Sequence, residues 1–312
     1  MLLTLLDIAK LNGRDMEVGL IEENLKYAPE VAKVPTRIIK GTAYHATIRT
    51  SLPEGGGFRS ANEGVTAGKS TFKKQLVECF LYSKLLKADT SVLNAGEDDS
   101  EESLKTLESS GGLKSAFDYL GEQFYYGVGF DAKGFPGIRS MSNPELELDA
   151  TGNTADTASS VYGVKFGVQN VHFIFGNKKA LHFQEWWKQL ANDGTGKEYA
   201  ALCSNLDVWM GLANGSKYSV GRLKNLTAQD GKGVTDAKLE ELKSKYPVGE
   251  KPDFWMMNRR SLFQLQKSRS TVINATGAKS KTGEEVFAPE PVSAAGIPII
   301  VTESIRDTDP VE

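Results

Sequence analysis

A long glycine-rich loop between two strand-like segments constrains the fold of this chain more than any other feature. Side chains from Thr42 to Arg49 alternate with period two, as in a β-strand, and residues 72–85 form a second strand-compatible segment. The loop between them, residues 51–68, is longer than most structureless connections in compact domains, and such loops are often functional. We therefore predict two long strands joined in a projecting hairpin, which is only marginally stable unless another surface packs against it.

The end of this loop reads GVTAGKST, Gly64 to Thr71, and is close to a phosphate-binding loop. In the pattern G-x-x-x-x-G-K-[ST], however, the first glycine falls on Glu63. A phosphate loop also needs a buried strand before it and a helix N-terminus after it, whereas here a polar loop precedes and a strand-like segment follows. We interpret the stretch as part of a hairpin tip, and a nucleotide-binding enzyme that uses Gly64–Thr71 is the less favoured alternative.

Composition indicates a folded protein of one large domain or two ordinary ones. The chain has 312 residues, of which 40% are apolar and 25% charged, with a net charge of −3. No basic surplus favours tight binding to nucleic acid. Cys79 and Cys203 follow no ligand spacing and are predicted to be buried thiols in a reducing compartment. No apolar run reaches membrane-spanning length, and Asp7 interrupts the apolar start, so neither a membrane span nor a secretory signal is expected.

Helical and strand patterns follow the hairpin. Residues 97–126 predict a helix with a capping box at Asp99, and Gly111–Gly112 weaken its middle, where a kink or a split into two helices is expected. Further predicted helices are Ala180–Ala191, Thr235–Tyr246 with a Thr cap, and a helix capped by Asn258 through Lys267 with Leu262, Phe263 and Leu265 inward. Further predicted strands are Val171–Phe175, Phe254–Met257 and Ile297–Thr302. These segments predict an α+β fold.

No group of residues predicts an active site. His45, His172 and His182 have no partners at metal-ligand spacing, except that Glu185 lies one helical turn from His182. The oxygen-rich segment 149–156 lacks the EF-hand pattern and is interpreted as a polar loop. We therefore predict no catalytic residue, no metal and no cofactor.

Three segments resemble the major capsid proteins of tailed double-stranded DNA phages. PTRIIKGTAYHATIRTSLPEGGGFRSANEG (Pro35–Gly64) resembles the entry into the extended loop of that family. KPDFWMMNRRSLFQLQKSRS (Lys251–Ser270) resembles the strand-then-helix piece of the axial domain, and AAGIPIIVTESI (Ala294–Ile305) resembles the closing strand. The resemblance in element order covers essentially the whole chain. It implies the Hong Kong 97-like capsid fold, with an N-terminal arm, an extended β-hairpin loop, a peripheral domain with a long spine helix, and an axial domain.

The resemblance also implies domain limits and a function. The arm corresponds to residues 1–34, the extended loop and its base to 35–90, the peripheral domain to 91–129 plus 296–312, and the axial domain to 130–295. The expected function is structural, not enzymatic. Copies of the chain self-assemble into pentamers and hexamers of an icosahedral phage head enclosing double-stranded DNA. An encapsulin-like shell protein, or a tail or other virion protein, is the alternative.

Partners and contacts follow from the same resemblance. The short arm implies a separate scaffolding protein, and the family implies a portal protein, weak non-specific contact with packaged DNA and a possible decoration protein. The expected location is the virion, after assembly in the host bacterial cytoplasm. At the loop tip, Glu54, Arg59, Glu63 and Lys69 are candidates for ion pairs between subunits, although each is equally well explained as a solvated charge. Lysine–asparagine crosslinks occur in some family members, and Lys69 and Lys73 are loop lysines.

Overall fold

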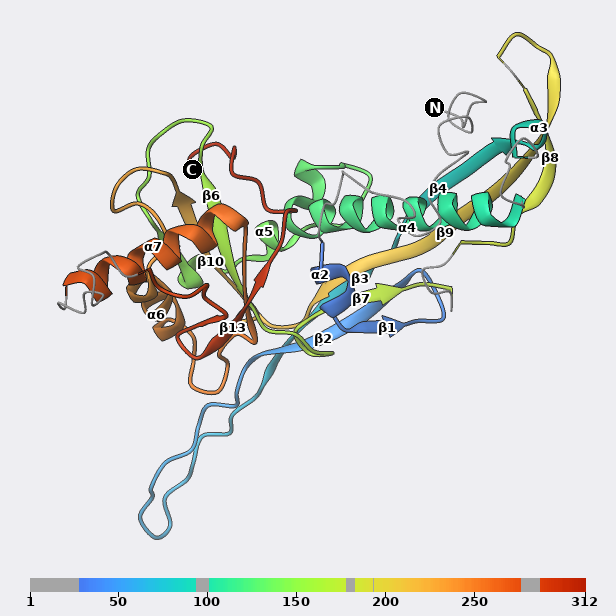
Figure 1. The fold of residues 1–312 in the computed structure, drawn as a ribbon. Coiled ribbons are helices and arrows are strands. Elements are labelled where there is room, and N and C mark those ends of the chain that lie inside the picture. The colour runs from blue at the N-terminus through green and yellow to red at the C-terminus, as the bar shows by residue number, and fades with distance from the viewer. Residues whose placement is uncertain (1–27, 94–100, 178–182, 193, 276–286) are drawn as a thin grey trace.

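Two β-sheets form the body of the molecule, and a hairpin projects from it (Figure 1). The computed structural model describes the whole chain except residues 1–27, 94–100, 178–182, 193 and 276–286. Most of the predicted arm therefore lies outside the described residues. Its described part contains the short helix α2, Glu30–Lys33.

The first sheet has five strands and includes the longest strand of the described chain. Its strands are β1 (Thr36–Ile38), β4 (Phe80–Asp89), β7 (Val171–Phe175), β8 (Trp187–Asn192) and β9 (Glu198–Asn214). β9 pairs antiparallel with β4, β7 and β8, and β1 is added parallel to β7. The predicted strand over residues 171–175 is confirmed as β7, and all five of its residues are buried.

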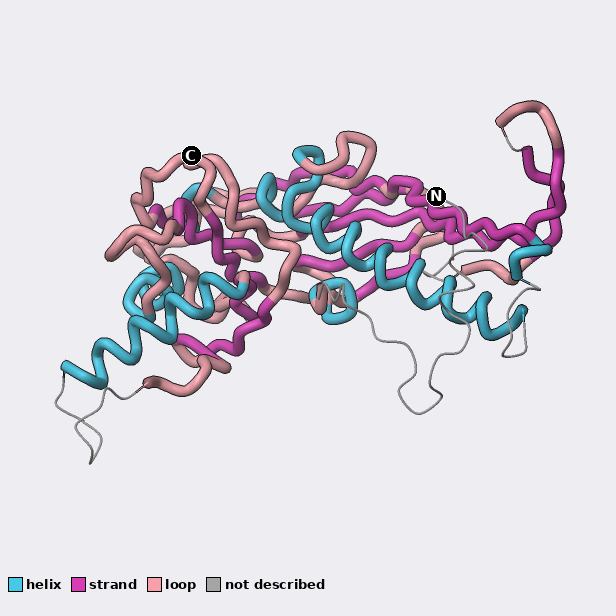
Figure 2. The backbone as a smooth tube through the Cα atoms, turned by 45° about the horizontal axis from the view of Figure 1, so that its top comes forward, coloured by secondary structure: helices cyan, strands magenta, loops and turns pink. Residues whose placement is uncertain are grey.

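A long helix, α4 (Glu101–Tyr126), lies along one face of the first sheet (Figures 1 and 2). Its Leu120, Phe124 and Tyr125 are fully buried and pack in one core with Phe173 and Val208 of the sheet. The rings of Phe124 and Phe173 meet edge to face, 5.7 Å between centroids. This core fixes α4 to the sheet, because large aromatic side chains contribute most of the apolar area.

The helix predicted over residues 97–126 is confirmed from Glu101 onward. The predicted capping residue Asp99 lies outside the described residues. α4 runs without interruption through Gly111 and Gly112, so these glycines do not split it.

The second sheet has six strands in the order β12-β13-β11-β6-β10-β5. They are β5 (Glu147–Asp149), β6 (Ser159–Val164), β10 (Val220–Leu226), β11 (Phe254–Met257), β12 (Ser293–Ala294) and β13 (Ile297–Val301). The predicted strands over residues 254–257 and 297–302 are thus confirmed. Short elements connect the larger ones: α3 (Thr90–Leu93), η1 (Gly127–Gly129), α5 (Ile138–Met141) and η2 (Pro144–Leu146).

Two helices, α6 (Asp236–Ser244) and α7 (Arg259–Ala275), contribute to the core on one face of the second sheet. Trp255 is fully buried in this core and donates a hydrogen bond to the Ala294 carbonyl oxygen, at 3.0 Å. On the other face, Met256 joins the core of the first sheet, where the Tyr125 hydroxyl lies 3.3 Å from its sulfur. The two sheets therefore share a continuous hydrophobic core.

Both predicted helix caps in this region are confirmed. The Thr235 side chain accepts a hydrogen bond from the Lys238 amide, and Asn258 Oδ1 accepts one from the Ser261 amide at 2.9 Å. α7 continues past the predicted end at Lys267 to Ala275. Phe263 is exposed, so its predicted inward orientation is wrong.

The predicted helix Ala180–Ala191 is wrong over its described residues, 183–191. Residues 183–186 are irregular, and β8 begins at Trp187 and pairs with β9 from Trp187↔Cys203 to Asn192↔Glu198. Pairing with β9 puts Trp187 into a small cluster with Ala201 and Cys203. Hydrogen bonds to a neighbouring strand thus override the local helical pattern.

The segment predicted as one strand over residues 72–85 is two strands. β3 (Thr71–Glu78) belongs to the hairpin, whereas β4 belongs to the first sheet. The break is at Cys79, whose amide donates to the Thr42 carbonyl oxygen at 2.7 Å. The chain changes partners at this residue because the hairpin ends where the body begins.

Each sheet combines strands that are far apart in the sequence. β13 shares the second sheet with β11. β7, β8 and β9 share the first sheet with β4, and β7 and β9 contribute to the core beside α4. The final strand is thus paired with strands from the middle of the chain and not with those beside α4.

Candidate functional site

The projecting hairpin is a separate two-stranded sheet of β2 (Ala43–Ser51) and β3 (Thr71–Glu78). The strands pair antiparallel from Ala43↔Glu78 to Ser51↔Thr71. The predicted alternation is confirmed: Tyr44, Ala46 and Ile48 are partly buried, and their neighbours in sequence are exposed. We refer to residues 43–78 as the hairpin and to residues 55–68 as its tip.

The base of the hairpin is fixed to the first sheet. Tyr44, Val77 and Cys79 pack with Ile174 in a small core, and burial raises the pKa of the Cys79 thiol to about 11. The Tyr44 hydroxyl lies 3.4 Å from His172 Nε2, whose pKa is lowered by burial. These contacts hold the hairpin's direction relative to the body.

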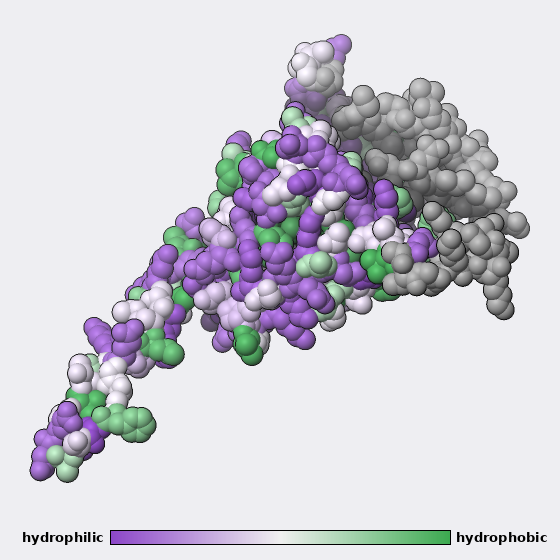
Figure 3. Space-filling view, turned by 90° about the vertical axis from the view of Figure 1, so that its left-hand side faces the viewer, coloured by the Kyte–Doolittle hydropathy of each residue, from purple (hydrophilic) through white to green (hydrophobic). Residues whose placement is uncertain are grey.

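Beyond this base, the hairpin stands clear of the body (Figure 3). One of its faces carries Phe72 and Leu76, which are 58% and 50% exposed, and the cations Arg49 and Lys74. Figure 3 shows hydrophobic patches among hydrophilic side chains along the projection. Because a lone two-stranded sheet is marginally stable in water, a surface of this kind indicates contact with another molecule.

The tip is closed by a narrow neck of backbone. A Cβ atom at Gly68 would lie 1.7 Å from the Glu54 carbonyl oxygen, and one at Gly55 would lie 2.5 Å from that of Thr66. Gly55 also has φ of +122°, which side chains rarely allow. Only glycine permits the two strands to approach so closely at these positions.

A tight turn inside the tip uses two of the four predicted contact residues. The Glu63 carboxylate accepts a hydrogen bond from the Ser60 amide at 3.0 Å, and the Glu63 amide donates to the Ser60 carbonyl oxygen at 3.2 Å. Arg59 donates to the Glu63 carbonyl oxygen at 2.8 Å, and Asn62 at the turn has φ of +66°. Arg59 and Glu63 therefore shape the tip within one chain.

Glu54 and Lys69 are exposed at the neck. No ion pair joins any two of Glu54, Arg59, Glu63 and Lys69 within the part of the chain that the structure describes. Their role as contacts between subunits stays a prediction. Phe58 is fully exposed in the tip, although no sequence pattern singled it out as a contact residue. Its position directly after three glycines is the one local feature that marks it as exposed.

The GVTAGKST stretch lacks the geometry of a phosphate loop. No helix begins after Ser70, because Thr71 is already the first residue of β3 and pairs with Ser51. No helix N-terminus is available there to hold a phosphate, so the nucleotide-binding alternative loses its structural basis.

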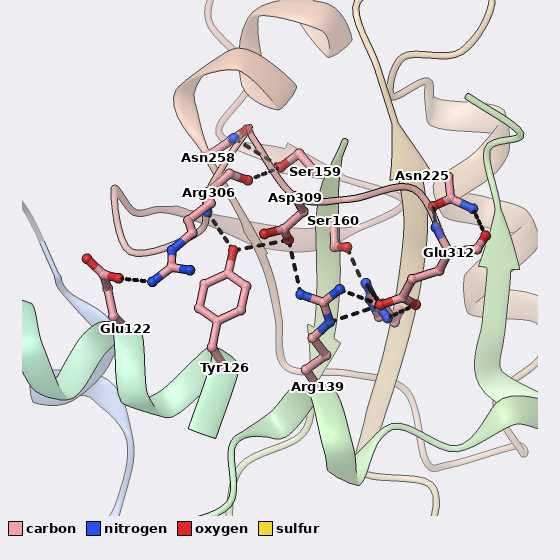
Figure 4. Close-up of polar contacts among 11 residues, drawn as sticks. Glu122, Tyr126, Arg139, Ser159, Ser160, Asn225, Asn258, Arg306, Asp309 and Glu312 are labelled. Atoms are coloured by element: carbon pink, nitrogen blue, oxygen red, sulfur yellow. Dashed lines mark hydrogen bonds and ion pairs between the residues drawn. The ribbon is translucent and has the colours of Figure 1, made fainter. Parts of the chain in front are cut away.

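A second polar site lies where the tail of the chain passes the end of α4 and the strands β6 and β10 of the second sheet (Figure 4). We call it the tail cluster: Tyr126, Arg139, Arg222, Arg306, Asp309 and Glu312. The Glu312 carboxylate lies between two guanidinium groups, 2.7 Å from Arg222 and in direct hydrogen-bond contact with Arg139. Burial alone would raise the pKa of Glu312, but hydrogen bonds and charges from these arginines lower it to about 2.

Asp309 is more buried than Glu312 and behaves differently. It accepts hydrogen bonds from Arg139 at 3.3 Å and from the Tyr126 hydroxyl at 3.2 Å. Burial raises its pKa, and the charges around it only partly compensate. The Tyr126 hydroxyl in turn accepts a hydrogen bond from the backbone amide of Arg306, at 2.7 Å. The Arg306 side chain forms an ion pair with Glu122 of α4. The tail cluster thus joins α4, α5 and β10.

Glu30 of α2 is a further buried carboxyl on the same side of α4. The Thr302 hydroxyl donates to its Oε1 at 3.0 Å, whereas its Oε2 has no hydrogen-bond partner among the described residues. Burial raises the pKa of Glu30, and the nearby charge of Asp118 adds to the shift.

Other predicted site candidates take ordinary structural roles. Asp149 accepts hydrogen bonds from the Thr151 amide and the Asn225 side chain, at 2.7 and 2.9 Å, and so closes its loop. His182 lies outside the described residues. Within the described ranges, no three His, Cys, Asp or Glu side chains gather closely enough to hold a metal ion. A search of the same ranges finds no helix with the length and apolar character of a membrane span.

Comparison with known proteins points to one family. The model of the family described as "Major capsid protein GP7" matches residues 37–311. Among solved structures, a chain from a near-atomic structure of bacteriophage Epsilon15 matches with a TM-score of 0.70 and 16% identity, covering 100% of this chain and 97% of the other. A chain of the bacteriophage JBD30 capsid matches with a TM-score of 0.51 and 7% identity, covering 90% and 91%. At these identities the structural matches show the fold, and they confirm the predicted α+β, Hong Kong 97-like architecture.

No curated protein sequence matches the chain.

Proposed function

The chain belongs to the major capsid protein GP7 family of phage structural proteins. From this premise we propose that copies of it form the pentamers and hexamers of an icosahedral head. In this assembly the hairpin of each copy lies across a neighbouring copy. The observation that carries the proposal is the hairpin itself. Its base is fixed in a small core of its own chain, whereas its outer face and tip expose apolar side chains to solvent.

A neighbouring copy supplies what the isolated hairpin lacks. Covering Phe72 and Leu76 removes apolar area from water, which is worth roughly 25 cal/mol per Å². Because the contact joins the hairpin of one copy to a different surface of the next, it is head-to-tail, the kind of contact that forms rings when the rotation between copies closes. Many weak contacts of this kind add up over a closed shell.

The construction of the hairpin suits two environments. Its fixed base keeps one direction, while a two-stranded sheet bends more easily than the packed sheets of the body. The same chain can therefore meet neighbours at the different angles of pentamers and hexamers.

We assign the peripheral domain to the first sheet with α4, and the axial domain to the second sheet with α6 and α7. This assignment places β13 in the same domain as β11, the strand with which it pairs.

The partners proposed for this assembly are a separate scaffolding protein, a portal protein and a possible decoration protein, with assembly in the host cytoplasm. The net charge of −3 supports weak, non-specific contact with the packaged DNA. The family match favours this phage capsid function over the encapsulin-like and enzymatic alternatives.

Removal of the loop tests the proposal. In one variant, residues 52–68 are replaced by a two-residue turn, which leaves β2, β3 and the base core intact. We expect a folded subunit, smaller than the unaltered 34.0 kDa chain, with unchanged far-ultraviolet circular dichroism but no closed shells when it is expressed with the other head proteins. Sedimentation velocity and electron microscopy give the readout, with the unaltered chain as control. Normal shells from the variant would refute the role of the hairpin.

A further inference from the structure

We propose that Phe58 is the anchor of the hairpin contact and that it docks between Leu81 and Leu85 of a second copy of this chain. This inference rests on the proposed function, in which the hairpin crosses a neighbouring copy. It names the contact residues on both sides.

The tip is built to present Phe58. The neck at Gly55 and Gly68 closes the loop, and the Ser60–Glu63 turn holds the segment that follows Phe58. The phenyl ring itself is fully exposed. A rigid loop with an exposed aromatic side chain loses little conformational entropy on binding, which is the usual property of an interface anchor.

The charged residues of the tip are weaker candidates for the same role. Arg59 and Glu63 already make hydrogen bonds inside the turn. Exposed groups at the neck, such as Glu54 and Lys69, form ion pairs that contribute little to binding, because water screens them. Most of the binding free energy is therefore assigned to the apolar side chain, and Arg59 and Glu63 are positioning residues.

The acceptor lies on β4, on the face of the first sheet opposite α4. Tyr82 faces α4, where its ring meets that of Tyr119 at 5.6 Å. Leu81 and Leu85 alternate to the other face and are 55% and 59% exposed. The small, exposed Ser83 lies between them on the same face, which leaves room for an aromatic ring.

Geometry requires that the acceptor belongs to another copy. Figure 1 shows the tip and β4 at distant ends of the molecule, with the hairpin pointing away from the first sheet. Phe58 therefore cannot reach Leu81 and Leu85 of its own chain.

Charge favours a second copy as the partner. The hairpin contains five Lys or Arg and three Glu, a formal charge of +2, although the whole chain has a net charge of −3. The rest of the chain therefore carries −5. Asp207 is paired with Ser83 across the strands, so an anion lies beside the acceptor, while the cation Lys87 lies further along the same face of β4. Opposite charges on the hairpin and on the body of the next copy steer the two together.

Disulfide trapping tests the contact directly. In assembled shells of the double variant Phe58→Cys/Leu85→Cys, we expect mild oxidation to give a ladder of linked chains on a non-reducing gel. Shells assembled from a mixture of the two single variants should give dimers only, because each chain then carries one half of the pair. The native Cys79 and Cys203 are buried and remain in place.

Each single variant alone controls for links between identical positions. Phe58→Cys/Val248→Cys is the control, since Val248 is an apolar residue in the turn before β11 and, at 105% exposure against 59% for Leu85, is the more accessible of the two positions. A ladder from this control that equals the ladder of the Leu85 pair, or no ladder from the Leu85 pair, would overturn the assignment.

Assembly of an alanine variant separates this inference from the function on which it rests. Phe58→Ala should raise the subunit concentration required for shells by about tenfold or more, whereas Glu54→Gln and Lys69→Gln should change it less than about twofold. If loss of residues 52–68 abolishes shells but Phe58→Ala assembles like the unaltered chain, the anchor is refuted and the hairpin function stands. If the loop variant forms normal shells, the proposed function itself is refuted.

Discussion

Buried carboxyl groups decide how this subunit responds to pH. Glu30 and Asp309 are buried and have raised pKa values, whereas Glu312 is held by two arginines and has a pKa of about 2. A lowered pKa stabilises the fold above the ordinary glutamate value of 4.5, and this contribution is lost as the pH falls towards 2. A raised pKa has the opposite sign: its contribution is present at low pH and is lost as the pH rises through the raised value.

Glu30→Gln isolates one of these groups. The amide keeps the acceptor for Thr302 and removes the buried charge, so the variant should become more stable than the unaltered subunit as the pH rises from 4 to 8. The gain at pH 8 should be about 1–3 kcal/mol, because removing the buried charge outweighs the cost of the amide nitrogen, which finds no acceptor at the position of Oε2. Urea unfolding at each pH measures it. Glu290→Gln, at an exposed position, should show no such trend, and an equal trend in both variants would contradict the assignment.

At the scale of single elements, the packing of α4 requires glycine at position 121 but not at position 111. A Cβ atom at Gly121 would lie 2.3 Å from Ser304 Oγ, 2.7 Å from Glu30 Oε1 and 3.0 Å from the Ala28 Cβ. The tail and α2 can therefore approach the helix only because residue 121 has no side chain. At Gly111, ten residues earlier in the same helix, nothing lies within 4 Å of the corresponding position.

Alanine at these two positions should have opposite effects. Gly121→Ala forces Ser304 and Glu30 apart and should lower the free energy of unfolding by about 1–3 kcal/mol. Gly111→Ala improves helix propensity without a clash and should raise it by about 0.5–1 kcal/mol. Denaturant unfolding of the two variants measures both, and stabilisation by Gly121→Ala would show that this close approach is not needed.

At the scale of the whole molecule, stability is unevenly distributed. The two sheets share a core with α4, whereas the hairpin has only its base in a core and exposes both of its strands beyond it. Such a part opens at low free energy cost in the free subunit and becomes protected only when another surface covers it.

Hydrogen exchange should show this difference. Amides of β2 and β3 should exchange at least about tenfold faster than those of β6 and β9 in the free subunit, and should become protected in assembled shells. Mass spectrometry of both states gives the comparison, with β6 and β9 as internal controls. Hairpin amides that exchange equally in the two states would contradict contact with a neighbour.

Local patterns predicted several parts of this fold correctly. The period-two alternation of residues 42–49 gave the strand and the partly buried face of β2, because that signal depends only on backbone geometry. The caps at Thr235 and Asn258 were equally predictable, since a capping side chain bonds within its own helix turn. Phe58 could be noticed in the sequence, but not its complete exposure.

What the sequence determined by itself was therefore local: the hairpin, the capped helices, the buried strand β7 and the resemblance to a capsid family. What only the tertiary structure decided depends on distant partners. β8 is a strand because β9 lies beside it, and Phe263 is exposed because α7 turns that side away from the core. The tail cluster is the extreme case: Glu312 meets Arg139 and Arg222, residues that lie 173 and 90 positions earlier in the chain. No local pattern encodes such a pair, because folding of the whole chain, and not spacing along it, brings the charges together.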